Sequence, residues 1–166
     1  MVTRLTIVYS RSMKNKFYLL PILVLMLSCS KKDTPQPQVE GPVTGRIYTS
    51  NFTAQNAVVK NVNFSYQNYK PEDLFAIYLS ANKGDDCSAD VKNFSVRLSV
   101  PKKIGKFREN DIYVLIDDPN SEEGALFSSD SVIEITSITA DKVTGTVDAK
   151  LENNSIKGRF EAKICQ

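Results

Sequence analysis

Residues 143–164, "VTGTVDAKLENNSIKGRFEAKI", decide the fold class. In the second half of this stretch, apolar or small residues alternate with charged ones: Ile156, Gly158, Phe160, Ala162 and Ile164 are separated by Lys157, Arg159, Glu161 and Lys163. Because successive side chains of a β-strand point to opposite faces, this alternation predicts a strand with one core face and one solvated face. The first half shares the pattern apolar-x-Gly-x-apolar-x-Ala and predicts the antiparallel partner strand.

The connection "ENNS" between these two segments predicts their register. Asparagine tolerates positive φ, so we expect the asparagines at 153–154 to form a two-residue turn. This turn places Val147 opposite Phe160, whereas a four-residue loop would place Ala149 opposite Ile156 and keep the same faces. Glycine at inward positions of both strands indicates a bend or the close approach of a bulky neighbour.

The same period of two continues through most of the chain beyond residue 42, and no segment keeps a helical repeat for three turns. We predict strands near residues 43–49, 57–66, 74–80, 94–100, 111–116, 131–138, 143–151 and 155–164. The short intervals between them favour antiparallel neighbours. The sequence therefore predicts one all-β domain at residues 43–166, a single antiparallel β-sandwich of about eight strands, with an up-and-down β-barrel as the alternative.

The composition excludes several function classes. The chain of 166 residues contains no histidine, which removes the usual general base and the commonest transition-metal ligand. G-x-S-x-G, Walker and G-x-G-x-x-G motifs are also absent. Residues 1–28 hold 4 of the 21 basic residues and none of the 19 acidic ones, so the rest carries 17 basic and 19 acidic residues, a net charge of −2. This near-neutral balance predicts no nucleic-acid partner.

The segment before Cys29 has the pattern of an export signal. Lys14 and Lys16 precede an apolar run at 17–27, which is too short to span a bilayer, since a spanning helix needs roughly 20 residues. Met13 is the natural start of such a signal, so the true start is open between Met1 and Met13.

The stretch "LMLSC", ending at Cys29, resembles the lipobox of bacterial lipoproteins, in which a small residue precedes a cysteine that is lipidated and becomes the mature N-terminus. The following "SKKD" resembles the start of many lipoproteins of the Bacteroidota, where it can direct export to the cell surface. The resemblance implies a signal peptide at 1–28, a lipid on Cys29 and a bilayer as partner. It also implies a lipid-anchored place at the bacterial outer membrane, periplasmic or surface-exposed.

Residues 29–42 are expected to form a tether. This segment contains three of the seven prolines, and an extended polyproline conformation at ~3.1 Å per residue could hold the domain up to ~40 Å from the lipid. With Cys29 committed to lipid, Cys87 and Cys165 remain as an even pair in an exported domain. Because oxidising compartments let disulfides persist, we predict that these two are joined.

Two further features suggest binding. The segment 63–79 contains Tyr66, Tyr69 and Tyr78, which could stack on sugar rings or seat a partner peptide if they are exposed. Two acidic stretches carry oxygen ligands: Asp85, Asp86 and Asp90 in the first, and Asp118, Asn120 and Glu122, at alternate positions, in the second. Neither has the EF-hand spacing, so we predict solvated acidic loops with no metal and no cofactor.

Taken together, these patterns favour a membrane-anchored module that is not an enzyme and that binds a glycan, a peptide or a neighbouring envelope protein. The alternative is a hydrolase that uses carboxylates or a Ser/Lys pair, which needs no histidine.

Overall fold

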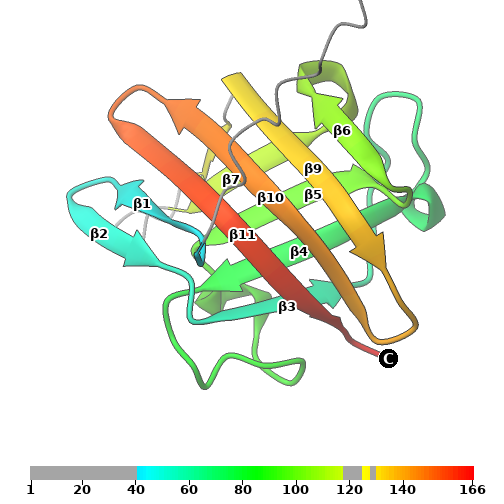
Figure 1. Cartoon of the computed structure of the whole chain (residues 1–166), viewed down its shortest axis with the longest axis horizontal. Helices are drawn as coiled ribbons and strands as arrows, with labels where there is room; N and C mark the ends of the chain where they lie inside the picture. Colours follow the sequence, from blue (N-terminus) through cyan, green and yellow to red (C-terminus); the bar gives the residue numbers. More distant parts are fainter. Residues whose placement is uncertain (1–40, 118–124, 128–129) are drawn as a thin grey trace, which may run out of the picture. The chain divides into compact units, whose positions relative to one another are not determined.

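The computed structural model describes residues 41–117, 125–127 and 130–166 (Figure 1). Eleven strands occupy these ranges: β1 (Thr44–Ile47), β2 (Ser50–Thr53), β3 (Asn56–Lys60), β4 (Leu74–Ser80), β5 (Val96–Pro101), β6 (Gly105–Arg108), β7 (Tyr113–Asp117), β8 (Ala125–Phe127), β9 (Asp130–Ile138), β10 (Lys142–Leu151) and β11 (Asn154–Ile164). Three short 3₁₀ helices, η1 (Pro71–Asp73), η2 (Val91–Asn93) and η3 (Glu109–Asp111), lie between them. Of the helices in the described ranges, none is long and apolar enough to cross a membrane.

The prediction of an all-β fold is confirmed, and each of the eight predicted strands is present. The bounds of β4 agree with the prediction at both ends, because this strand is a continuous apolar run with clear turn signals on either side. The expected number of about eight was low, since β2, β6 and β8 were missed. These strands have four, four and three residues, which is too short for a period of two to be recognised.

The strands form one continuous sheet that curls into a half-barrel. Its front half has the order β6-β9-β10-β11, with β1 and β2 added beside β11, and its back half has the order β3-β4-β5-β7-β8. The strands of the two halves cross in the view of Figure 1. The halves join where Lys163 and Ile164 of β11 pair in parallel with Val58 and Val59 of β3. The two layers expected for a sandwich are therefore halves of one sheet, and this one parallel junction makes the sheet mixed rather than wholly antiparallel.

The main core lies between the inner faces of the two halves. It joins residues of the back half with residues of the front half in a single buried cluster, which includes Ile77, Leu98, Val114, Ile133, Val147 and Phe160. Every strand that contributes to it lies within residues 41–166, as does the disulfide between Cys87 and Cys165. The domain thus carries its own core and its own covalent cross-link.

The predicted hairpin register is wrong by two residues in the pairing. Ala149 lies opposite Ile156, as in the alternative register, but the turn still has two residues, Glu152 and Asn153. Glu152 takes the positive φ of 51°. The reason is that Asn154 is buried in β11, where its side-chain oxygen accepts a hydrogen bond from the backbone N–H of Tyr48. Asn154 therefore cannot serve as a turn residue.

The inward glycines are close-approach sites, as predicted. A Cβ on Gly145 would lie 2.7 Å from the ring of Phe160, which lies opposite it on β11. Gly158 has a φ of +151°, and a Cβ there would lie 2.4 Å from the carbonyl oxygen of Pro42. The chain before β1 therefore runs against β11, and the backbone N–H of Arg159 donates to the carbonyl oxygen of Gly41 at 2.9 Å. The last two residues of the predicted tether belong to the domain.

Candidate functional site

The outer face of the back half of the sheet carries the candidate site. Along β4, β5 and β7, the residues that alternate with the core positions face outward, and they include Tyr78, Arg97, Ser99, Tyr113 and Asp117. The segment 61–70, between β3 and η1, adds aromatic side chains over this face. We call the set Phe64, Tyr66, Arg97, Ser99, Tyr113 and Asp117 the Arg97 face.

Three aromatic rings form one edge of the Arg97 face. The ring of Tyr113 lies 5.6 Å from that of Tyr66 and 6.1 Å from that of Phe64, with tilted planes in both pairs. All three side chains are half-buried, so part of each ring remains open to solvent. The hydroxyl of Tyr66 also donates to the backbone carbonyl oxygen of Glu109 at 3.5 Å. Partly exposed rings held in place this way can stack on an apolar or sugar surface.

Tyr69 has a structural contact instead. It pairs with Tyr66 across the turn at 67–68, and its hydroxyl donates to Oδ1 of Asp111 at 2.9 Å. This hydrogen bond to a carboxylate raises the pKa of Tyr69, because loss of the phenol proton would place two negative charges together. Tyr69 therefore ties segment 61–70 to η3 and helps to position Tyr66.

Tyr78 is buried, so the prediction that it is an exposed ligand-binding tyrosine is wrong. Its ring packs edge-on against Phe94, with centroids 5.5 Å apart, because loop 81–95 covers this part of the outer face. The guanidinium carbon of Arg97 lies 5.1 Å from the centroid of the same ring. A cation over an aromatic face is attracted by the ring quadrupole, so Tyr78 supports Arg97 from the side.

Arg97 and Ser99 hold the least satisfied polar atoms of the described residues. Nε of Arg97 and Oγ of Ser99 are both buried and have no hydrogen-bond partner. In the part of the chain that the structure describes, no carboxylate lies within 4.0 Å of the Arg97 guanidinium. A buried polar atom without a partner costs about 1–3 kcal/mol of stability.

Tyr113 and Asp117 both interact electrostatically with Arg97, and both have shifted pKa values. Partial burial raises the pKa of the Asp117 carboxyl, and the charge of Arg97 opposes this shift. Partial burial likewise raises the pKa of Tyr113, with Arg97 again acting in the opposite direction. A cation, a carboxylate and a phenol that share one partly desolvated patch can donate to and accept from the hydroxyl groups of one ligand.

Sequence reasoning located Tyr66 but missed Arg97, Ser99, Tyr113 and Asp117. Arg97 and Ser99 lie on β5, and Tyr113 and Asp117 lie on β7, which does not follow β5 directly in the chain. A sequence signal for them does exist. Each is a polar residue at an outward position of a strand that also carries apolar residues at outward positions.

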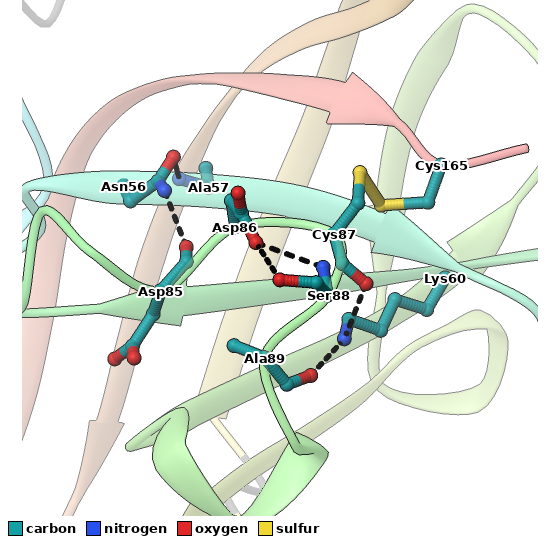
Figure 2. Close-up of a disulfide and its surroundings, with 9 residues drawn as sticks. All are labelled: Asn56, Ala57, Lys60, Asp85, Asp86, Cys87, Ser88, Ala89 and Cys165. Atoms are coloured by element: carbon teal, nitrogen blue, oxygen red, sulfur yellow. Dashed lines mark hydrogen bonds between the residues drawn. A yellow bond between two sulfur atoms is a disulfide. The ribbon is translucent and has the colours of Figure 1, made fainter.

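The predicted pair of Cys87 and Cys165 is joined, with Cα atoms 5.5 Å apart (Figure 2). Lys60 of β3 holds the same loop by donating from Nζ to the carbonyl oxygens of Cys87 and Ala89. Because Cys165 follows β11, the bond joins the end of the chain to loop 81–95. The loop thereby covers a second buried cluster on the outer face, formed by Val58, Ala76, Tyr78 and Phe94.

The first acidic stretch has a structural role rather than a wholly solvated one. Asp85 is buried, and its carboxylate accepts a hydrogen bond from the hydroxyl of Ser80. Asp86 accepts from the hydroxyl and the backbone N–H of Ser88 (Figure 2), which lowers the pKa of Asp86. The side chain of Asp90 caps η2 by accepting from the backbone N–H of Lys92. Among the described residues there is no group of three or more acidic or cysteine side chains that could hold a metal ion.

Several predicted features lie outside the described residues. They are the signal peptide at 1–28, Cys29, the tether up to residue 40, and the second acidic stretch with Asp118, Asn120 and Glu122. Comparison of the chain with protein-family models, with curated proteins and with solved structures finds no match.

Proposed function

We propose that this protein is an exported, lipid-anchored binding module that takes a glycan at the Arg97 face. The disulfide supports export, because cross-links of this kind persist in oxidising compartments and are rare where thiols are kept reduced. It also consumes two of the three cysteines, which leaves Cys29 as the single thiol of the chain. That thiol lies in the sequence context of a lipobox, where a thioether to diacylglycerol would anchor the mature chain.

The observation that carries the ligand class is the exposed edge of aromatic rings beside a cation and a carboxylate. A sugar ring presents an apolar face, which can stack on Tyr66 or Tyr113, and hydroxyl groups at its rim. Asp117 can accept from such hydroxyls, and Arg97 can donate to their oxygens. A bound acceptor would supply the guanidinium with the partner that the described residues do not provide.

Asp117 lies near a cation, whereas hydrolysis by paired carboxylates depends on a second acid. A glycosidase of the usual kind needs a second acid about 5–10 Å away, and that acid would raise the pKa of the first. In the described part of the chain, Arg97 is the one charged group that shifts the pKa of Asp117. The patch combines donors, acceptors and stacking surfaces, which fits binding of a sugar.

The anchor is tested by mass spectrometry of the protein expressed in a bacterium with a lipoprotein pathway. We expect the mature N-terminus to be acylated Cys29, and Cys29→Ala to move the protein to the soluble fraction. Cys87→Ala provides the control, since it also loses a cysteine but keeps the lipobox. Membrane association of Cys29→Ala that survives salt and carbonate washing would contradict the anchor.

The ligand class is tested on an array of bacterial and host glycans, with Arg97→Met and Tyr113→Ala as variants. We expect either change to weaken binding about 10-fold or more, because one charge-assisted hydrogen bond or one stacked ring is worth roughly 1.5–3 kcal/mol. Arg46→Met on β1 is the matched control, because this arginine is exposed on the other half of the sheet. The proposal would be overturned if the wild-type domain bound nothing on the array, or if Arg97→Met and Tyr113→Ala both bound as wild type does.

A further inference from the structure

The outer face of the front half is a solvated and mainly basic surface. The outward positions of β1, β6, β9, β10 and β11 carry eight basic and four acidic residues, a net charge of 8 − 4 = +4. We call these residues the basic face: Arg46, Lys106, Arg108, Lys142, Lys150, Lys157, Arg159 and Lys163, with Asp130, Glu134, Asp148 and Glu161.

The rest of the domain has the opposite charge. Residues 41–166 contain 15 basic and 17 acidic residues, which is 21 − 6 and 19 − 2 after removal of those in residues 1–40. Three of these acidic residues, Asp118, Glu122 and Glu123, lie outside the described residues. The described residues outside the basic face therefore carry 15 − 8 = 7 basic and 17 − 3 − 4 = 10 acidic side chains, a net charge of −3. A domain of almost neutral total charge is thus strongly polarised, and a charged surface would orient it.

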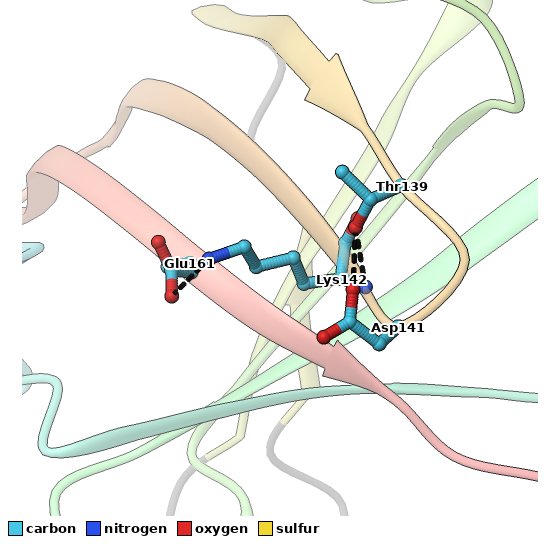
Figure 3. Close-up of polar contacts among 4 residues, drawn as sticks. All are labelled: Thr139, Asp141, Lys142 and Glu161. Carbon is cyan, nitrogen blue, oxygen red and sulfur yellow. Dashed lines mark hydrogen bonds and ion pairs between the residues drawn. The ribbon is translucent and has the colours of Figure 1, made fainter.

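Asp148 and Glu161 on the basic face form ion pairs with lysines of the same face. Nζ of Lys157 lies 2.6 Å from Oδ2 of Asp148, and Nζ of Lys142 lies 3.1 Å from Oε1 of Glu161 (Figure 3). Both pairs are largely exposed, so each is worth little to folding. Each pair cancels one acidic charge against one basic charge, so the net charge of the face remains +4.

The chain enters the domain beside this face. Gly41 is hydrogen-bonded to Arg159 in the middle of β11, and Pro42 forms a parallel bridge with the same residue. Cys29 lies 12 residues before Gly41, a distance of at most ~37 Å at ~3.1 Å per residue. A tether of this length confines the domain near the bilayer at an effective concentration of the order of mM. A weak attraction then suffices to bring the face onto the surface.

We infer that the basic face lies on the membrane that holds the anchor and contacts its anionic lipid headgroups. This inference rests on the proposed lipid anchor. Each Lys or Arg within about 8 Å of an anionic surface contributes to attraction at physiological salt. The Arg97 face lies on the outer side of the other half of the sheet, so docking through the basic face presents the ligand site away from the membrane.

The test uses residues 41–166, which have their own core and disulfide and lack the confounding Lys31 and Lys32. Binding is measured by co-sedimentation with phosphatidylcholine vesicles and with vesicles that also contain about 30% phosphatidylglycerol. We expect binding to the anionic vesicles alone, and release at about 0.5 M salt, where screening is within ~5 Å. Arg108→Gln/Arg159→Gln/Lys163→Gln, three exposed changes on the basic face, should weaken binding about 100-fold at low salt.

The matched control is Lys70→Gln/Lys83→Gln/Lys92→Gln, which removes the same charge from exposed positions outside the basic face. We expect this triple variant to bind almost as wild type does. Equal weakening by the two triple variants, equal binding to neutral vesicles, or binding to double-stranded DNA in preference to anionic vesicles would each overturn the inference. Failure of Cys29 acylation would be seen separately, because residues 41–166 do not contain the anchor.

Discussion

The two halves of the sheet contribute to the same core from opposite sides, and they differ in what lies on their outer faces. On the front half, β11 alternates between buried and exposed residues for most of its length, and its outer side chains reach solvent. On the back half, all seven residues of β4 are buried, because segments 61–70 and 81–95 add further contacts outside the sheet. The front half thus has one core face and one solvent face, whereas part of the back half lies between the core and the loops that cover it.

This difference separates two kinds of surface chemistry. Loops that cover a sheet bring in backbone carbonyls, aromatic rings and a disulfide, so polar groups there become partly desolvated and their pKa values shift, as at Asp117. The uncovered face keeps its charges in water, where single ion pairs contribute little and only the summed charge matters. Specific recognition is therefore expected on the back half and orientation by charge on the front half.

The largest expected effect comes from removing the disulfide that holds loop 81–95 over the back half of the sheet. Cys87→Ala/Cys165→Ala opens a closure of 78 residues, for which the loop-entropy model gives about 4.5 kcal/mol. We expect the free energy of unfolding, measured by urea denaturation, to fall by about 3–4 kcal/mol. Hydrogen exchange in the folded state should rise in loop 81–95 and in β4, while the β10–β11 hairpin keeps its protection. Equal loss of protection in both halves would show that loop 81–95 and the β10–β11 hairpin do not open independently.

A middle-sized effect tests the front half. Asn154→Ala removes the side-chain oxygen that accepts from the part-buried N–H of Tyr48, so we expect a loss of about 1–3 kcal/mol by thermal or urea unfolding. Asn153→Ala is the matched control, since Asn153 is exposed in the turn, and it should change stability by less than about 0.5 kcal/mol. If both changes cost the same, Asn154 has no special role in the register.

The smallest effect concerns pH at the β9–β10 turn. The hydroxyl of Thr139 donates to Oδ1 of Asp141 at 2.7 Å, which lowers the pKa of that carboxyl (Figure 3). A lowered pKa in the folded state contributes stability that is complete above the ordinary aspartate pKa and is lost as pH falls through the folded value. We therefore expect Asp141→Asn to be slightly less stable than wild type near neutral pH.

The difference between Asp141→Asn and wild type should shrink as the pH falls below about 4, and urea midpoints across this range would measure it. Thr139→Val should reproduce the same pH dependence without changing the charge. A gap between Asp141→Asn and wild type that is independent of pH would contradict the assignment.

Sequence reasoning recovered features that depend on local pattern. The period of two gave the strands of the hairpin, and the continuous apolar run "LFAIYLS" gave both ends of β4. The register failed because the role of Asn154 depends on Tyr48, 106 residues away, which no local turn preference contains. Tyr78 was misplaced for a related reason, since its burial comes from a loop that packs over the strand.

The candidate site was only partly predictable. Tyr66 stood out in a run of aromatic residues, whereas Arg97 and Asp117 are single polar residues on separate strands. They lie close together because β5 pairs directly with β7, although β6 and η3 separate these two strands in the sequence. The disulfide was predictable because the number of cysteines left a single pair once Cys29 was set aside.

The parallel junction between β11 and β3 has a consequence for how the chain folds. The antiparallel neighbours β3, β4, β5 and β7 can pair early in folding, because each follows closely on the one before in the chain. β3 gains its other neighbour only when Lys163 and Ile164 of β11 pair with it. The N–H of Cys165 then donates to the carbonyl oxygen of Val59 at 2.9 Å. Contacts between such distant parts of a chain form slowly. The half-barrel therefore closes only when β11 pairs with β3, and the same pairing brings Cys165 to loop 81–95, where Cys87 lies.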